Sequence, residues 1–479
     1  MITKPEIVKH TLFKIIGKCG DSLNVETFVV GGWVRDYILN RHTKEIEFDI
    51  VCDGDGILLA KKVADKLKLK NIAIYKNFGT AAISYKNIKI EFNGARKESY
   101  TKNSRNPTVE KGSIEDDQKR RDFTINAMSV KLNQKGFGEF IDPFNGINDI
   151  EKKIIRTPLD PVKTYDDDPL RMIRAIRFAS ILDFEIEEKS LKAIKKLSGR
   201  LKIIQQERIT DELNKIILSK KPSFGINLLS ETGLLNLFFP EFEQLRGIEV
   251  INGISHKDNF YHTLQVLDNI CKTDSNIWLR WAAILHDIAK PRTKRFNKKN
   301  GWTFHGHEHL GSKMVLSIFK KLKLPMNENM RYVQKLVLLH LRPIGLSKEK
   351  VTDSAIRRLL FDAQDDIDDL LQLCHADITS KNEKKVIKYQ NNLKIVAEKL
   401  QEIEEIDKIR NWRHPINGQI IIEKINIKGG KSNPKGGKNI GIIKEKIKEA
   451  ILDGKIKNNY KDAEKLMYEV AKEIGLNPR

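Results

Sequence analysis

Three carboxylates recur at every second position of the stretch KEIEFDIVC, residues 44–52. Glu45, Glu47 and Asp49 alternate there with isoleucine and phenylalanine. Because alternate side chains of a β-strand share one face, these carboxylates would line up about 7 Å apart per step. Two of them could hold a pair of Mg²⁺ ions, which lie about 3.5–4 Å apart in two-metal sites. A solvent-exposed face of an edge strand is the alternative interpretation of the same alternation.

A glycine pair lies just upstream of this acidic stretch. The sequence TFVVGGWVRDYILN predicts a short buried strand, a turn at Gly31 and Gly32, and then a helix. Such a turn lets backbone N–H groups approach a phosphate at the start of the helix. Arg35, in the first turn of that helix, could reach a triphosphate. Beside the acidic stretch, this turn favours phosphoryl or nucleotidyl transfer.

A carboxylate and a guanidinium lie three residues apart in DDDPLRMIRAIRF, at Asp168 and Arg171. On a helix they would share a face, either as a simple exposed ion pair or as a base-selecting pair. A carboxylate only accepts hydrogen bonds and a guanidinium only donates them. The pair would therefore match the amino donor and ring acceptor of cytosine and adenine and oppose guanine and uracil. Arg174 and Arg177 continue the basic face, and we count both among the predicted nucleotide-binding residues.

Elements that could position these residues can be predicted from periodicity. Residues 71–95 alternate with period two, which predicts a meander ending in a strand from Ile88 to Phe92. We therefore expect an α+β head over residues 1–150. Beyond it the periodicity is helical without strand-like runs, which predicts a neck over 151–240. Eight of the eleven histidines lie between His256 and His375, which indicates a helical module over 241–380.

The remaining composition points to a nucleic-acid partner. Lys and Arg outnumber Asp and Glu by 86 to 64, giving a net charge of +22 that suits a polyanion. Residues 381–479 form a basic tail, in which IKGGKSNPKGGK, residues 427–438, predicts a flexible cationic loop. No apolar run approaches the roughly 18 residues of a spanning helix, which argues against a membrane. Four scattered cysteines and no signal-peptide pattern predict a cytoplasmic protein.

Several ordered motifs within residues 25–240 resemble one family. GGWVRDYIL with the acidic pair after it, EFNGARKESY, RRDFTINAM and DPLRMIRAIRFAS are similar to class II tRNA nucleotidyltransferases and bacterial poly(A) polymerases, which have a polymerase-beta-type head. The family pattern Asp-x-Asp before IVxxGDG, set against DIVCDGDG, makes Glu47 and Asp49 the metal-binding pair. Counting from the glycine turn would give Glu45 and Glu47. We adopt the first alignment, in which Glu replaces the usual Asp and Glu45 lies outside the site.

The same resemblance implies roles for further residues. Glu91 would be the third acidic residue of the catalytic site, and Arg208 falls in a motif of the neck. Residues that handle the ribose and phosphates would be Arg121, Asp122 and Asn126. The histidine-rich module resembles an HD domain, and its metal ligands would be His262, His286, Asp287, His307, His340 and Asp377.

The resemblance predicts template-independent addition of C and A to the 3′ end of tRNA. CTP and ATP would be the substrates, pyrophosphate would leave, and the head would use Mg²⁺ while the HD site would bind another divalent metal. A poly(A) polymerase, or an enzyme that adds only part of CCA, is the first alternative. The second is a metal-dependent phosphohydrolase in the HD module, with a head that merely binds RNA.

Overall fold

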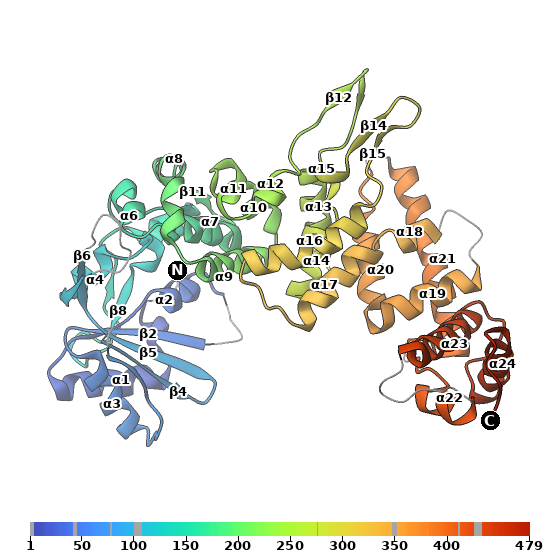
Figure 1. Ribbon diagram of the computed structural model, residues 1–479. Helices are drawn as coiled ribbons and strands as arrows, with labels where there is room; N and C mark the ends of the chain where they lie inside the picture. Colours follow the sequence, from blue (N-terminus) through green and yellow to red (C-terminus); the bar gives the residue numbers. More distant parts are fainter. Residues whose placement is uncertain are drawn as a thin grey trace. The chain divides into compact units, whose positions relative to one another are not determined.

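The computed structural model describes residues 4–41, 46–76, 79–99, 108–274, 276–346, 352–380, 382–410, 412–425 and 434–479. The chain divides into two compact units, Met1–Glu243 and Gln244–Arg479 (Figure 1). The first unit holds a mixed sheet and the second is mostly helical, so the predicted α+β class is confirmed. The finer boundaries near residues 150, 240 and 380 stay predictions.

A seven-stranded sheet forms the centre of the first unit, in the order β3-β4-β5-β2-β1-β8-β9. Strands β2 and β5 run parallel, and the other neighbours in this sheet are antiparallel. The strands of the sheet are β1 (Thr27–Val30), β2 (Ile46–Cys52), β3 (Ala73–Tyr75), β4 (Thr80–Tyr85), β5 (Ile88–Gly94), β8 (Ser129–Lys131) and β9 (Phe140–Ile141).

The alternation along β2 separates a packed face from an acidic face. Phe48 is fully buried, and its ring lies 4.4 Å from that of Phe13 on α1 (Thr11–Leu23). Helices α1 and α3 (Gly56–Lys66) lie together on this side of the sheet (Figure 1). Glu47 and Asp49 therefore point to the opposite face, where they are register partners of Lys89 and Glu91 on β5.

Helices and short ribbons complete the first unit. The ribbons pair β6 (Arg96–Ser99) with β7 (Thr108–Lys111) and β10 (Ile154–Ile155) with β11 (Glu185–Ile186). The other helices are η1 (Lys4–Val8), α2 (Gly32–Ile38), α4 (Ile114–Lys119), η3 (Thr124–Asn126), α5 (Gly146–Glu151), α6 (Pro161–Asp167), α7 (Leu170–Leu182), α8 (Glu188–Leu197), η4 (Ser198–Ile203), α9 (Gln206–Ile217), α10 (Pro222–Glu231), α11 (Leu234–Phe238) and α12 (Pro240–Glu243).

The second unit is helical apart from two adjacent hairpins, which pair β12 (Val250–Ile251) with β13 (Ile254–Ser255) and β14 (Arg295–Asn297) with β15 (Gly301–Thr303) (Figure 1). Its helices are α13 (Asn259–Cys271), α14 (Ile277–Leu285), α15 (Lys290–Thr293), α16 (His307–Lys321), α17 (Glu328–Leu339), α18 (Arg342–Leu346), α19 (Asp353–Ala363), η5 (Gln364–Asp366), α20 (Ile367–Asp377), α21 (Glu383–Asp407), α22 (Gly418–Lys424), α23 (Pro434–Leu452) and α24 (Tyr460–Glu473). Within the described ranges, every helix is too short or too polar to cross a membrane.

Two sequence expectations need correction here. Strands do occur beyond residue 150, but their two or three residues are too few to produce a period-two pattern. The loop expected over 427–438 is wrong for its last part, because α23 begins at Pro434. Proline is favoured at the first helical position, where its missing N–H costs nothing. The rest of that loop, and Glu45 with it, lies outside the described residues.

Candidate active site and metal centre

Three carboxylates share the acidic face of the head sheet. Asp49 and Glu91 are register partners on β2 and β5. Glu47 lies two residues before Asp49, on the same face of β2. The side chain of Glu47 is 53% exposed, and its Oε1 lies 2.6 Å from Nζ of Lys89. The same Nζ lies 4.0 Å from Oε2 of Glu91. On this face Lys89 therefore lies between two of the three acidic groups, Glu47 and Glu91.

Burial sets the electrostatics of Asp49. It raises the pKa of this carboxyl to about 6, and the charges of Glu47 and Glu91 add to the rise, while Arg121 and Lys89 oppose it. Because the ionised form of Asp49 is disfavoured, a cation placed beside it would stabilise the charged carboxylate. Mg²⁺ takes oxygen ligands and is usually held by one or two carboxylates together with substrate phosphates. The donor set of Glu47, Asp49 and Glu91 fits such an ion.

The glycine turn lies directly against Asp49. Gly31 has φ of 71°, a conformation that favours glycine. A Cβ atom there would lie 3.0 Å from Nη1 of Arg121 and 3.3 Å from Oδ2 of Asp49. From the sequence we expected backbone N–H groups of this turn to approach a phosphate. The N–H of Gly31 donates instead to the carbonyl of Met128 at 3.3 Å. The close approach at Gly31 thus serves the packing of Asp49 and Arg121, while Gly32 begins α2.

Arg35 is tied to neighbouring side chains. It is 8% exposed, and its Nη1 donates to Oδ1 of Asn126 at 2.7 Å. Asn126 in turn donates from Nδ2 to Oδ1 of Asp122 at 2.9 Å. Nε of Arg174 donates to the other oxygen of Asp122 at 2.8 Å. These predicted nucleotide-binding residues form one hydrogen-bonded chain, which is buried except at Arg174 and in which Arg35 is held by the protein.

Arg177 also has a protein partner. Its Nε lies 2.6 Å from Oε2 of Glu212, a side chain that is 5% exposed. Its guanidinium stacks on the ring of Phe178, 4.0 Å from the centroid. Burial lowers the pKa of Arg177 to about 10, an effect that Glu212 opposes. This geometry favours a structural role for Arg177 over the predicted contact with a nucleotide.

Two cavities open on the acidic face, and most of the site residues predicted in the first unit line them. The smaller, of about 480 Å³, is lined by Asp49, Tyr75, Thr80, Glu91, Asn93, Arg96, Arg120 and Arg121. The larger, of about 660 Å³, is lined by Glu91, Arg96, Arg120, Arg121, Asp122, Asp168, Arg171, Arg174 and Arg208. Four residues belong to both linings, so the cavities adjoin at Glu91 and its three neighbouring arginines.

Asp168 and Arg171 reach the larger cavity, but the helical spacing predicted for them is wrong. Helix α6 ends at Asp167, and Asp168 has an extended backbone with φ of −136° and ψ of 97°. The cause is Pro169, because a residue before proline is disfavoured in the helical region. The carboxylate of Asp168 accepts from the N–H of Leu170 at 3.2 Å, near the start of α7. Nη2 of Arg171 donates to the carbonyl of Arg120 at 2.7 Å.

Arg96 and Arg120 line both cavities and were not predicted from the sequence. Arg120 directly precedes Arg121 in RRDFTINAM, so the doubled arginine was the available signal. Arg96 follows β5 on the ribbon strand β6 and belongs to the motif EFNGARKESY, so that motif was the available signal. The smaller cavity also includes Tyr75, from the edge strand β3, whose side chain is largely exposed.

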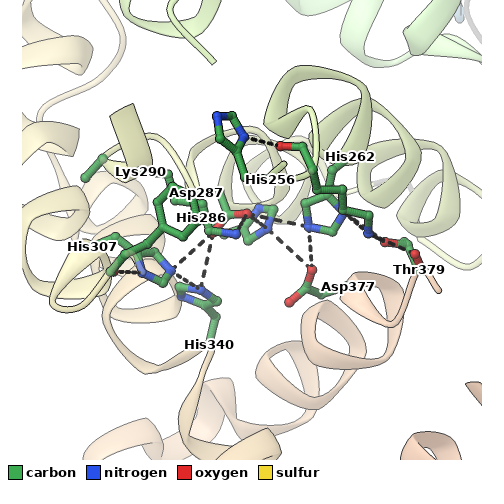
Figure 2. Close-up of polar contacts among 12 residues, drawn as sticks. His256, His262, His286, Asp287, Lys290, His307, His340, Asp377 and Thr379 are labelled. Atoms are coloured by element: carbon green, nitrogen blue, oxygen red, sulfur yellow. Dashed lines mark hydrogen bonds and ion pairs between the residues drawn. The ribbon is translucent and has the colours of Figure 1, made fainter. Parts of the chain in front are cut away.

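In the second unit, six predicted ligands lie together and are called here the histidine cluster (Figure 2). They come from α13, the end of α14, the start of α16, the end of α17 and the end of α20, and they are His262, His286, Asp287, His307, His340 and Asp377. Two trios have ligand atoms within 4.8 Å of one another. Asp287 belongs to both trios, and all members of both are buried.

Asp287 lies between the histidines. Its Oδ1 is 3.2 Å from Nε2 of His307, and its Oδ2 is 3.2 Å from Nε2 of His286. On the other side, Nε2 of His262 lies 2.8 Å from Oδ1 of Asp377. Nζ of Lys290 lies 2.5 Å from Oδ2 of Asp287 (Figure 2). The two carboxylates thus have histidine nitrogens around them on several sides.

Backbone carbonyls fix the tautomers of three histidines. Because a carbonyl only accepts, Nδ1 carries the proton and Nε2 of the neutral ring is an acceptor. The Nδ1 donors lie 2.8 Å from the oxygen of Ala283 for His286, 2.7 Å from that of Phe304 for His307, and 2.7 Å from that of Val337 for His340. This arrangement, with Nε2 directed inward, is typical of histidines that bind a metal.

The inward nitrogens need a cation. Nε2 of His307 and Nε2 of His340 lie 3.3 Å apart, so two acceptors face each other. Nε2 of His286 is buried and makes no well-aligned hydrogen bond among the described residues, although Oδ2 of Asp287 lies 3.2 Å from it. Burial opposes protonation of His286, but Asp287 and Asp377 outweigh it and raise its pKa to about 10. Burial, together with the charge of His286, lowers the pKa of His340 to about 4. The cluster therefore attracts positive charge, and its nitrogen and oxygen donors fit divalent metal ions.

Three family profiles match the chain. The poly A polymerase head domain matches residues 27–156, a probable RNA and SrmB-binding site of polymerase A matches 183–245, and the HD domain matches 259–382. One solved structure, a CCA-adding enzyme in complex with ATP, is similar over 97% of this chain and 95% of its own, with a TM-score of 0.62 and 24% identity. At that identity the likeness concerns the fold alone.

Curated relatives carry related names. A multifunctional CCA protein of Psychromonas ingrahamii is 31% identical over 371 residues, which are 74% of this chain and 84% of the relative. An A-adding tRNA nucleotidyltransferase of Deinococcus radiodurans is 32% identical over 273 residues, 55% of this chain and 60% of the relative. Against other A-adding relatives the chain spans 23% to 55% of their length. The chain therefore belongs to the family of tRNA nucleotidyltransferases and multifunctional CCA proteins that carry a poly A polymerase head domain.

Proposed function

We propose that this chain adds C and A nucleotides to the 3′ end of tRNA without a nucleic-acid template. The observation that carries the proposal is the pair of adjoining cavities that joins the carboxylates Asp49 and Glu91 to Asp168 and Arg171. Membership of the family and the net charge of +22 support RNA as the second substrate. The reaction would take place in the cytoplasm, as suits four cysteines that form no disulfide.

The chain's own residues divide the work between the cavities. Asp168 and Arg171 would accept from and donate to the base of CTP or ATP in the larger cavity. The arginines shared by both cavities would bind the phosphates. Glu47, Asp49 and Glu91 would hold Mg²⁺ beside the α-phosphate and orient the RNA 3′ hydroxyl for in-line attack, with pyrophosphate leaving. Bound Mg²⁺ would lower the pKa of that hydroxyl and offset charge on the leaving group.

Incorporation assays with defined RNA ends test this proposal. Purified protein with Mg²⁺ is offered tRNA lacking CCA, tRNA lacking only the terminal A, and an unstructured RNA, with each nucleotide separately. With CTP alone we expect C on the first substrate, with ATP alone we expect A on the second, and with CTP and ATP together we expect CCA on the first. Neither G nor U is expected on any substrate. Incorporation of G or U at the rate of C or A would contradict the base-selecting pair.

The same assay separates the remaining alternatives. An A-adding enzyme would extend only the tRNA that lacks the terminal A, as the names of several relatives suggest. A poly(A) polymerase would add long A tracts to the unstructured RNA. We favour complete CCA addition because the multifunctional CCA relative matches over the larger share of both chains.

A second activity is favoured by the histidine cluster. We propose that it hydrolyses phosphate esters, because four histidines and two aspartates gathered in one cluster are more than a structural module needs. A divalent metal pair held there would supply Lewis acidity for that hydrolysis. Release of phosphate from p-nitrophenyl phosphate and ring opening of a 2′,3′-cyclic nucleotide to its 2′- or 3′-phosphate, each assayed with Mn²⁺, Ni²⁺ and Mg²⁺ in turn, test the proposal. Hydrolysis of neither compound with any of these metals would contradict it.

A further inference from the structure

Asp117 is a fully buried carboxylate near the end of α4, with 0% of its surface exposed. Its Oδ1 pairs with Nη2 of Arg120, and its Oδ2 lies 2.9 Å from both Nε and Nη2 of Arg121. Burial alone would raise the pKa of Asp117, but the two arginines outweigh it and hold the pKa below its ordinary value. Asp117 is therefore a stable anion that binds two guanidinium groups at once.

Both of these arginines line both head cavities, whereas Asp117 lines neither. Arg121 also donates from Nη1 to the carbonyl of Asn126 at 3.3 Å, which fixes its guanidinium beside Asp49. The carbonyl of Arg120 accepts from Nη2 of Arg171 at 2.7 Å. One buried carboxylate is thus connected, through two arginines, to the acidic face and to the base-selecting pair.

The charges of these residues indicate which kind of ligand the arrangement suits. The lining of the larger cavity holds six arginines and only three carboxylates, Glu91, Asp122 and Asp168, so positive charge is in excess there even after Asp117 neutralises one guanidinium group. Such a surplus suits the phosphates of an incoming nucleotide, because positioned arginines bind phosphate oxygens in bidentate fashion. The residual charge is fixed in place, because each guanidinium has lost much of its rotational freedom to Asp117.

A role confined to helix α4 does not account for Asp117. The start of that helix is already closed by a capping box, in which Ser113 and Asp116 bond to each other's backbone N–H groups. A helix cap would also have been satisfied by an exposed side chain. The cost of burying a charge is instead offset by the two arginines that the carboxylate directs to the cavities.

We propose that Asp117 is a positioning residue for nucleotide binding and selection, acting through Arg120 and Arg121 on the phosphates and through the Arg120 carbonyl on Arg171. The inference rests on the proposed nucleotidyl transfer. Asp117 itself lies outside the cavity linings. Through the carbonyl of Arg120 it would hold Arg171 of the base-selecting pair in its orientation.

The test uses the full chain with Asp117→Asn. This variant replaces one carboxylate oxygen, which accepts hydrogen bonds from the arginines, with an NH₂ group that only donates them. We expect the KM for CTP and ATP to rise about 10- to 100-fold, with a smaller change in kcat. The ratio of G and U incorporation to C and A incorporation should rise about tenfold. Glu115→Gln, an exposed charge removal on the same helix, is the matched control and should keep the wild-type KM and ratio.

The ratio of incorporation rates does not depend on the fraction of folded protein, so partial unfolding cannot mimic the effect. If Asp117→Asn does not fold at all, Asp117→Glu is measured instead, and a raised KM is expected because the longer side chain displaces the carboxylate that positions both arginines. Wild-type KM and ratio in the folded variant would overturn the inference alone. Absence of all incorporation by the wild type would overturn the proposed function, and the inference with it.

Discussion

The acidic face of the head and the histidine cluster both offer carboxylates to metal ions, but they differ in completeness. Two trios in the cluster already have their ligand atoms within 4.8 Å, and both are buried. Among the described residues of the head no such trio occurs, and Glu47 is 53% exposed and paired with Lys89. A resident metal fits the cluster, whereas the head is suited to Mg²⁺ that arrives with nucleotide phosphates. From this difference we propose that the two sites are independent and would bind metal in different ways.

The largest effect should come from replacing one aspartate with asparagine in each of the two sites. Asp49→Asn should lower nucleotide incorporation about 10³-fold or more, because the metal-binding charge at the reacting phosphate is lost. Asp287→Asn should abolish phosphate release in the same way, since Asp287 is shared by both trios. Each variant should retain the other activity, as measured by tRNA extension and by hydrolysis of p-nitrophenyl phosphate.

The control for these two variants is Asp53→Asn. Asp53 is exposed just beyond β2, and its replacement should leave both activities at the wild-type rate. Loss of both activities in either Asp49→Asn or Asp287→Asn would contradict the independence of the two sites.

Metal content should separate the sites without any assay of activity. Protein passed through gel filtration in metal-free buffer should keep divalent metal in the cluster, because its ligands are buried and already aligned. Asp287→Asn should lose this metal, while Asp49→Asn should match the wild type, as measured by inductively coupled plasma mass spectrometry. Equal metal in the wild type and in Asp287→Asn would remove the basis for a resident metal.

The sequence predicted the parts of the fold that have strong local signals. The acidic strand, the strand beginning at Ile88 and the helical second unit all follow from periodicity and lie where expected. Long-range contacts were not predictable in this way. Asp117 is buried by its pairing with two arginines, and Lys89 faces Glu47 only because β5 pairs in parallel with β2.

The candidate site shows the same limit. Asp168 and Arg171 both line the larger cavity, yet the helical face assumed for them does not exist, because Pro169 separates α6 from α7. For Arg35 and Arg177 the residue type indicated a nucleotide, but their partners, Asn126 and Glu212, come from distant positions of the chain. Residue types therefore located the chemistry, whereas the partner of each charge required the fold.

A third prediction concerns the energetic cost of the acidic face. The rise in the pKa of Asp49 from 3.8 to about 6 corresponds to about 3 kcal/mol. Because the folded-state pKa is raised, this contribution to stability is present below pH 3.8 and is lost as pH increases through about 6. Asp49→Asn mimics the protonated form. It should raise the free energy of unfolding at pH 8, less so at pH 5, in thermal denaturation with EDTA present. A variant less stable than the wild type at pH 8 would contradict this sign.

The smallest effect should come from Lys89, which distinguishes the incomplete head site from the cluster most directly. Its charge lowers the pKa of Asp49, so Lys89→Met should raise that pKa above about 6. The acid limb of kcat/KM for ATP, which reports on the free enzyme, should then move to higher pH, by less than about one pH unit. Phosphate release by the cluster should not change.

The profile is measured from pH 5 to pH 8 at saturating Mg²⁺, with Lys61→Met, an exposed lysine on α3, as the control. Removal of Lys89 also frees Glu47, so half-maximal incorporation should need less Mg²⁺. An acid limb that moves to lower pH would mean that Lys89 does not act on the ionisation of Asp49. A higher Mg²⁺ requirement would mean that the lysine helps to hold Glu47 ready for the metal, and the head would then be as preorganised as the cluster.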